Sequence, residues 1–136
     1  METVLVKIRW LILQDWKIFL VKLTKEWFWC LPGWTLEKWE SLEECLYREI
    51  FEELWVQSII WKQVYQQHFI RETWTHTFDF WYQILNPNDF KNINIEKASH
   101  WFEIAEAGFF DINNLDDLDF EVKPNWIKSI VESIWI

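Results

Sequence analysis

One predicted helix constrains this chain more than any other feature. Ser41, followed three residues later by Glu44, forms a capping box, and this pattern predicts a helix over about residues 41–54. At about 100° per residue, the apolar side chains of that helix fall on one face, which we expect to pack on the core. They are Leu42, Cys45, Leu46 and Ile50.

Acidic side chains share the apolar face of this helix. Glu49 and Glu53 project from its middle, and Glu52 lies at its margin. Most glutamate-rich helix faces are simply solvated, but carboxylates on a buried face would be desolvated and would repel one another. Either a raised pKa or a divalent cation must compensate, and oxygen ligands of this kind favour Mg²⁺ or Mn²⁺.

The region from Trp34 to Val56 resembles the Nudix box, whose pattern is G x5 E x7 R E U x E E x G U, with U a bulky aliphatic residue. Glu40, Arg48-Glu49-Ile50, Glu52-Glu53 and Val56 occupy the corresponding positions. The two glycines of the pattern are replaced, by Trp34 and Trp55.

The resemblance implies an α/β fold, a Nudix-type α/β/α sandwich with a mixed β-sheet, formed by residues 1–136 as a single Nudix domain. The box helix would span about residues 41–54. A closing helix is expected over about residues 124–134, where Ile127, Ile130, Val131 and Ile134 follow helical spacing.

The resemblance also implies an activity, the hydrolysis of a nucleoside diphosphate linked to another moiety, such as a nucleoside triphosphate or a nucleotide-sugar-like compound. Glu49, Glu52 and Glu53 would bind Mg²⁺ or Mn²⁺, Glu40 would assist through the water shell of the metal, and Arg48 would orient a neighbouring glutamate. Nudix enzymes differ in which glutamate acts as the general base, and we favour Glu49 here.

Other residues are weaker candidates for the site. Nudix enzymes often contribute a further carboxylate from beyond the box, for which Glu103 and Glu106 are candidates, although a surface glutamate is commoner. Trp29 precedes the Leu31-Pro32-Gly33 segment and is a candidate for substrate contact. The alternative is a catalytically inactive Nudix-like domain that binds nucleotides or serves as a scaffold.

Tryptophan is abundant and glycine is scarce. The chain has 13 Trp and 2 Gly, whereas about 7% glycine is usual. Asp15-Trp16 stands between two apolar segments, where Asp-Gly would form a type I′ turn. Trp55 stands just past the predicted helix, where glycine is favoured because the backbone is left-handed.

We therefore hypothesise that UGA encodes glycine in the gene and has been translated as tryptophan. The residues concerned are Trp10, Trp16, Trp27, Trp34, Trp39, Trp55, Trp61, Trp74, Trp101 and Trp135, whereas Trp29, Trp81 and Trp126 fit apolar patterns. The alternative is a genuinely tryptophan-rich protein that stacks on sugars or lies at a membrane interface.

The distribution of apolar and β-branched residues predicts two hairpins. The first combines residues 2–13 and 17–23, turning at Asp15-Trp16, and the second combines residues 56–70 and 76–85. Short strands are expected over residues 28–31 and within 103–110.

Composition limits the partners and the cellular location. The formal charge of −9 argues against long nucleic acids, which require a basic surface, and leaves small phosphorylated ligands possible. The resemblance implies that the partner is a small nucleotide. We find neither a membrane span nor a signal peptide, and we expect a cytoplasmic protein with Cys30 and Cys45 as reduced core thiols. The sequence does not decide between a monomer and a homodimer.

Overall fold

The computed structural model describes residues 3–26, 28–36, 40–70, 74–98, 103–118 and 124–134. The strands are β1 (Thr3–Leu11), β2 (Leu13–Gln14), β3 (Lys17–Leu23), β4 (Trp29–Cys30), β5 (Gly33–Thr35), β6 (Ile60–Ile70), β7 (Thr75–Ile84) and β8 (Ile104–Asp111). The α-helices are α1 (Leu42–Leu54) and α2 (Pro124–Ile134), and 3-10 turns span Pro87–Phe90 (η1), Ile95–Lys97 (η2) and Ile112–Asp117 (η4). Both predicted helices are therefore confirmed.

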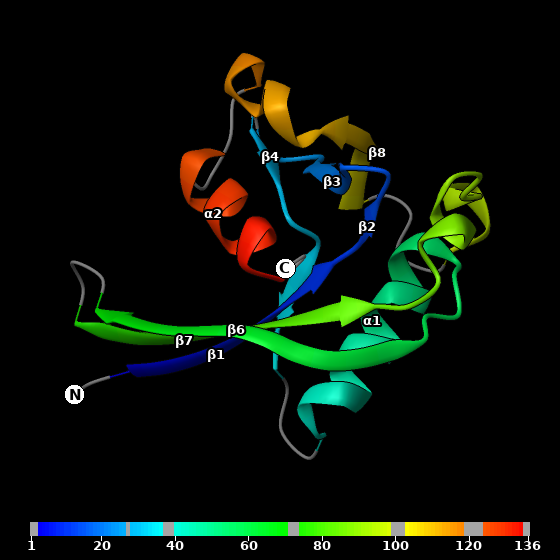
Figure 1. Ribbon diagram of the computed structural model, residues 1–136. Helices are drawn as coiled ribbons and strands as arrows, with labels where there is room; N and C mark the ends of the chain where they lie inside the picture. Colours follow the sequence, from blue (N-terminus) through cyan, green and yellow to red (C-terminus); the bar gives the residue numbers. More distant parts are fainter. Residues whose placement is uncertain are drawn as a thin grey trace.

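A mixed sheet has the strand order β5-β1-β7-β6. β1 runs parallel to β7, whereas the β1–β5 and β6–β7 pairs are antiparallel. Figure 1 shows β1, β6 and β7 as one extended layer, with α1 beside one end of it. This mixed sheet and its helices confirm the predicted fold class, and the second predicted hairpin is present as β6 and β7.

The other strands form a second, antiparallel sheet, in which β3 pairs with β2, β4 and β8. The first predicted hairpin is correct only near its turn, where Leu13 pairs with Ile18 and Gln14 with Lys17. Residues 3–11 pair instead with β5 and β7 in the other sheet. The chain changes sheets at Ile12, which is fully buried between two apolar stretches and so carries no turn residue to mark the break.

Two clusters of buried residues fill the interior. One joins Ile8 and Trp10 of β1 with Cys45, Leu46 and Ile50 of α1. The other joins Leu11 and Trp81 with apolar residues of α2, namely Ile127, Ile130 and Val131. The helices thus cover different parts of the core, α1 on one side and α2 on the other (Figure 1). Both cysteines are buried and free, as predicted.

Residues other than glycine adopt left-handed backbone conformations at several turns. The φ angles are 50° at Asp15, 60° at Trp16, 59° at Trp55 and 59° at Trp74. Consecutive positive φ angles at Asp15 and Trp16 are characteristic of a type I′ turn, which favours Asp-Gly. Trp16, Trp55 and Trp74 are all among the tryptophans that we suspect to be glycine.

Candidate functional site

Helix α1 is held at both ends by local interactions. Oγ of Ser41 accepts a hydrogen bond from the backbone N–H of Glu44 at 3.1 Å, so the predicted cap is present. At the other end, the backbone N–H of Trp55 donates to the carbonyl oxygen of Phe51 at 3.0 Å. These caps fix where the helix begins and ends, and therefore which side chains face the core.

The glutamates of α1 differ strongly in burial. Glu49 and Glu53 are each only 2% exposed, on the same face as the fully buried Cys45, Leu46 and Ile50. The side chain of Glu52 is 26% exposed at the margin of that face. The helix therefore carries carboxyl groups into the protein instead of scattering them over its surface.

Arg48 connects three of the candidate carboxylates. Its Nη1 lies 2.7 Å from Oε1 of Glu49 and 2.9 Å from Oε2 of Glu52. Its Nε and Nη2 donate to the two carboxylate oxygens of Glu40 at 3.1 and 2.9 Å. The bidentate bond to Glu40 is the main cause of a raised Arg48 pKa, and nearby Glu49 and Glu52 raise it further. Arg48 thus orients Glu40, Glu49 and Glu52 around one guanidinium group.

The remaining box glutamate, Glu53, lies against Glu103, which immediately precedes β8. Their side chains are hydrogen-bonded, and burial together with the nearby charge of Glu49 raises the pKa of Glu53 to about 9. The carboxyl group of Glu53 is therefore protonated at neutral pH. Of the two candidates beyond the box, Glu103 is the one that lies beside the box glutamates.

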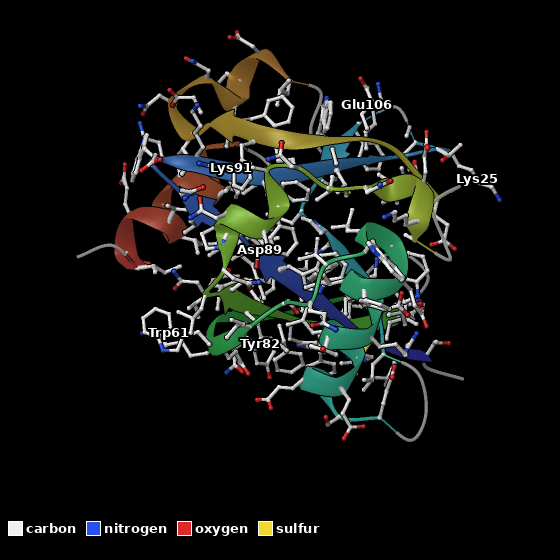
Figure 2. The ribbon with its side chains drawn as sticks, turned by 90° about the vertical axis from the view of Figure 1, so that its right-hand side faces the viewer. Lys25, Trp61, Tyr82, Asp89, Lys91 and Glu106 are labelled. Atoms are coloured by element: carbon white, nitrogen blue, oxygen red, sulfur yellow. The ribbon has the colours of Figure 1, made fainter. Side chains whose placement is uncertain are left out.

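The other two weak candidates lie elsewhere. Glu106 extends outward from β8 (Figure 2), where its side chain is 61% exposed and lies 3.9 Å from Nζ of Lys22. Trp29 packs edge-on against Phe110, with the ring centroids 4.7 Å apart, beside the second core cluster. Neither residue takes part in the contacts described above for the box glutamates.

Within the described residues, no group of three or more His, Cys, Asp or Glu side chains is already arranged as a metal site. Glu40, Glu49 and Glu52 are instead directed to Arg48. The chemistry of the oxygen donors nevertheless fits Mg²⁺ or Mn²⁺. Oε1 of Glu53 and Oε2 of Glu103 are buried without a hydrogen-bond partner, as expected of oxygens that have a further ligand.

A cavity of about 240 Å³ adjoins one of these glutamates, Glu53. Glu53 lines it, together with residues of β1, β3 and β5 and of the segment that contains β4. Lys7, Arg9 and Phe28 belong to its wall, and the two cations were not predicted as site residues. A sequence signal for these two cations does exist. Charged and apolar residues alternate over residues 7–10, which places Lys7 and Arg9 on one face of β1.

A sequence profile described as the NUDIX domain matches residues 7–129. The chain belongs to the NUDIX domain family. Its membership confirms the resemblance inferred from the box and identifies the chain as a Nudix hydrolase. No curated protein matches the sequence significantly.

Solved structures with the same fold have low sequence identity to this Nudix chain. A UDP-X diphosphatase is 23% identical with a TM-score of 0.73, over 96% of this chain and 62% of that protein. The MutT protein from Methanosarcina mazei Go1 is 16% identical with a TM-score of 0.69, and the match covers 97% of this chain and 93% of that protein. An ADP-ribose pyrophosphatase from Streptococcus suis 89-1591 is 18% identical with a TM-score of 0.67, and the match covers 95% of this chain and 90% of that protein.

The described part of this Nudix chain has no helix that is both long and apolar enough to cross a membrane.

Proposed function

We propose that this Nudix chain is a divalent-metal-dependent hydrolase that cleaves the pyrophosphate linkage of nucleoside diphosphate derivatives. The observation that carries the proposal is the burial of Glu49 and Glu53 on the apolar face of α1, next to glutamates oriented by Arg48. A buried carboxyl cluster is costly for stability, and a bound cation would offset that cost.

We assign the metal to Glu49, Glu52 and Glu53, with Glu40 assisting through the water shell and Mg²⁺ or Mn²⁺ as the ion. When bound, such a cation screens pyrophosphate charge and lowers the pKa of a bound water. Arg48 keeps the carboxylates in place, and Glu49 is our candidate for the general base. Glu103 lies close enough to Glu53 to join the same group, as their shared hydrogen bond indicates.

The names of similar structures support a nucleotide substrate without identifying it. One is a UDP-X diphosphatase and another an ADP-ribose pyrophosphatase. We propose a nucleoside triphosphate or a nucleotide-sugar-like diphosphate for this chain. The net charge of −9 is consistent with a small nucleotide and disfavours a long nucleic acid.

The test is to incubate the purified chain and Mg²⁺ with nucleoside triphosphates and with nucleotide sugars. Hydrolysis is measured as release of pyrophosphate or phosphate from the triphosphates, and as release of a nucleoside monophosphate and a sugar phosphate from the nucleotide sugars. Glu52→Gln and Glu53→Gln each replace a proposed ligand with a side chain of similar size, and we expect either change to abolish most turnover. Glu43→Gln is the matched control, because Glu43 is exposed on the same helix. Turnover that persists in EDTA, or equal activity in all three variants, would refute the assignment.

A second candidate function is nucleotide binding without catalysis. The NUDIX domain of Shewanella oneidensis NrtR has been crystallised with ADP ribose, and it is 16% identical with a TM-score of 0.67 over the whole of this chain and 90% of that one. The complete set of box glutamates favours the enzyme. Saturable binding of nucleotides without cleavage, in the assay above, would favour the binding domain.

We also propose that the suspect tryptophans are glycine in the native protein, encoded by UGA. The left-handed conformations of Trp16, Trp55 and Trp74 support this, because a side chain there costs about 1–2 kcal/mol that glycine avoids. Trp10 lacks this support, since its side chain is 1% exposed within the core. Trp34 and Trp61 have no positive φ, and Trp27, Trp39, Trp101 and Trp135 lie outside the described residues.

The tryptophans that we consider authentic behave differently. Trp81 is fully buried and packs edge-on against Tyr65, with the ring centroids 5.1 Å apart, and Trp29 packs against Phe110. The side chain of Trp126 is not described. Codons decide the matter, since UGG at all ten suspect positions would refute recoding.

We propose that residues 1–136 form a single domain and act in the cytoplasm. The first core cluster supports the single domain, because it joins residues of both sheets, including Trp10 of β1 and Phe19 of β3. Limited proteolysis should therefore leave one resistant fragment, whereas two stable fragments would contradict a single domain.

A further inference from the structure

A second cavity lies at the other end of β3 from the cavity beside Glu53. Its volume is about 270 Å³, and it is lined by residues of β2, the turn into β3, η1 with the segment that follows it, and β8. Lys17 begins β3 at this cavity, whereas Val21 and Leu23 of the same strand line the cavity beside Glu53. Among the described residues, the two cavities have no lining residue in common. The hydrolysis proposed above uses none of the residues around the second cavity.

The charges on the wall of this second cavity favour an anion. Lys17 and Lys91 (Figure 2) both line it, and Asp15 is the one acid among its described lining residues. The wall is therefore positive overall, on a chain whose formal net charge is −9. Within the described part of the chain, neither lysine takes part in an ion pair. Two ammonium groups match a phosphate monoester, which carries nearly two negative charges at neutral pH, better than a carboxylate with one.

Two further acids lie near these lysines in the chain or across the sheet, and both have other partners. Asp111 is in register with Lys17 between β8 and β3, and its Oδ1 accepts a hydrogen bond from the backbone N–H of Asn113 at 2.8 Å. Asp89 of η1 accepts a hydrogen bond from Nδ2 of Asn86 at 2.7 Å. These carboxylates are therefore engaged by neighbouring amides, and the lysines of the cavity are left to attract an anion from solution.

The rest of the wall offers aromatic surface and a polar amide. The rings of Phe90 and Phe109 pack edge-on against Phe19, with ring centroids 5.4 and 5.3 Å apart, and this packing makes the apolar wall rigid. Gln14 also lines the cavity. Its Nε2 donates to Oδ1 of Asn88, and its Oε1 is buried without a hydrogen-bond partner, which is costly. A ligand with a hydrogen-bond donor would relieve that cost once the amide turns toward it.

We propose that this second cavity binds a small phosphate monoester, at a site separate from the box glutamates. The phosphate oxygens accept hydrogen bonds from the ammonium groups of Lys17 and Lys91, and the organic part of the ligand packs on the ring of Phe109. The volume is just below the roughly 300–1,000 Å³ of sites for drug-sized ligands, so the ligand is small, such as a sugar phosphate or a mononucleotide. The inference does not depend on the proposed hydrolysis, because binding here requires neither a metal nor turnover.

The two glycines of the chain provide a separate reporter for each cavity. Gly108 lines the second cavity, and Gly33 lines the cavity beside Glu53. Labelling the full chain with ¹⁵N-glycine therefore gives one backbone amide signal in each cavity. The probes are UMP, AMP and ribose 5-phosphate, added in EDTA so that no divalent metal is bound. We expect at least one of these monoesters to shift the Gly108 signal saturably, and the corresponding compound without phosphate, such as uridine for UMP, to bind much more weakly.

Variants of the two lysines test the site directly. Lys17→Gln and Lys91→Gln should each raise the Kd measured at the Gly108 signal by about tenfold, because each removes a charge-assisted hydrogen bond to phosphate. Both lysines are exposed, so these variants should fold normally. Lys62→Gln is the matched control, since Lys62 is an exposed lysine outside the cavity, and it should leave the Kd unchanged.

Several results would overturn this site. They are the absence of a Gly108 shift with all three monoesters up to about 10 mM, a shift of the Gly33 signal alone, and a Kd in both lysine variants equal to that in Lys62→Gln. Binding of inorganic phosphate as tight as that of the monoesters would contradict the contact with the organic part. Each of these results leaves the hydrolase assignment untouched, because that assignment is tested by turnover with Mg²⁺ and by variants of the box glutamates.

Discussion

Glu53 on α1 and Glu103 before β8 share a hydrogen bond between two carboxyl groups. Such a bond requires a proton on one of them, and the raised pKa of Glu53, about 9, places the proton there. The box helix is thereby joined to the second sheet through an acid that is neutral at physiological pH.

This shared proton predicts how stability depends on pH in EDTA. The folded-state pKa of Glu53 is about 9, above the value of 4.5 for an unperturbed glutamate. Between these values the unfolded chain releases a proton that the folded chain retains, so stability falls as pH rises through this range. Urea denaturation at several pH values should show a decreasing free energy of unfolding.

Glu53→Gln supplies the control for that slope. Glutamine cannot ionise but can donate a hydrogen bond to Glu103, so the variant should lose the contribution of this site to the pH dependence. An equal slope in the variant would show that another group causes it. Glu43→Gln should retain the slope, because Glu43 is exposed.

The same proton predicts a linkage to metal binding. A carboxyl group must be deprotonated to bind a cation, so uptake of Mg²⁺ should release a proton from Glu53 at neutral pH. Calorimetric titrations in buffers of different ionisation enthalpy should detect this release, and Mg²⁺ affinity should rise from pH 7 to pH 9. Affinity that is independent of pH would exclude Glu53 from the metal site.

Arg48 should matter for both stability and turnover. Replacement by glutamine leaves Glu40, Glu49 and Glu52 without their shared cation, and the part-exposed position of Arg48 limits the cost to about 1–2 kcal/mol. Arg48→Lys keeps the charge but cannot reproduce the bidentate contact with Glu40. Chemical denaturation and kcat should both rank the wild type above Arg48→Lys, and Arg48→Lys above Arg48→Gln.

A change of similar chemistry on another strand is the control for Arg48. Lys62→Gln removes an exposed cation of β6 that contacts the ring of Trp61. It should alter neither kcat nor stability by much. If Arg48→Gln behaved like Lys62→Gln, Arg48 would have no positioning role.

Local signals explain why the box helix was predictable. The cap formed by Ser41 and Glu44, and the shared apolar and acidic face, are properties of neighbouring residues, and the structure reproduces both. The change of sheets at Ile12 is different. It depends on which distant strands pair with β1, and neither Ile12 nor its neighbours show this in the sequence.

The cavity beside Glu53 was equally hidden. Phe28, Lys7 and Glu53 come from separate elements, and only the assembled fold brings them to one wall. Contact between Glu53 and Glu103 also depends on the packing of α1 near the start of β8. The sequence offered Glu103 and Glu106 on equal terms, and their different environments distinguish them only in the structure.

Trp55 provides the last prediction, because it has a φ of 59° and a side chain that is 45% exposed. Trp55→Gly should relieve the left-handed strain. The greater flexibility of glycine in the unfolded chain and the lost contact with Phe51 offset part of this relief. The net gain in the free energy of unfolding should be on the order of 1 kcal/mol. Trp81→Gly is the matched control, and it should cost about 3–5 kcal/mol because Trp81 is fully buried. Urea denaturation measures both changes. Trp55→Gly also removes a ring at the end of the box helix. If it lost as much stability as Trp81→Gly, Trp55 would be an integral part of the fold, and the glycine hypothesis would be wrong at this position.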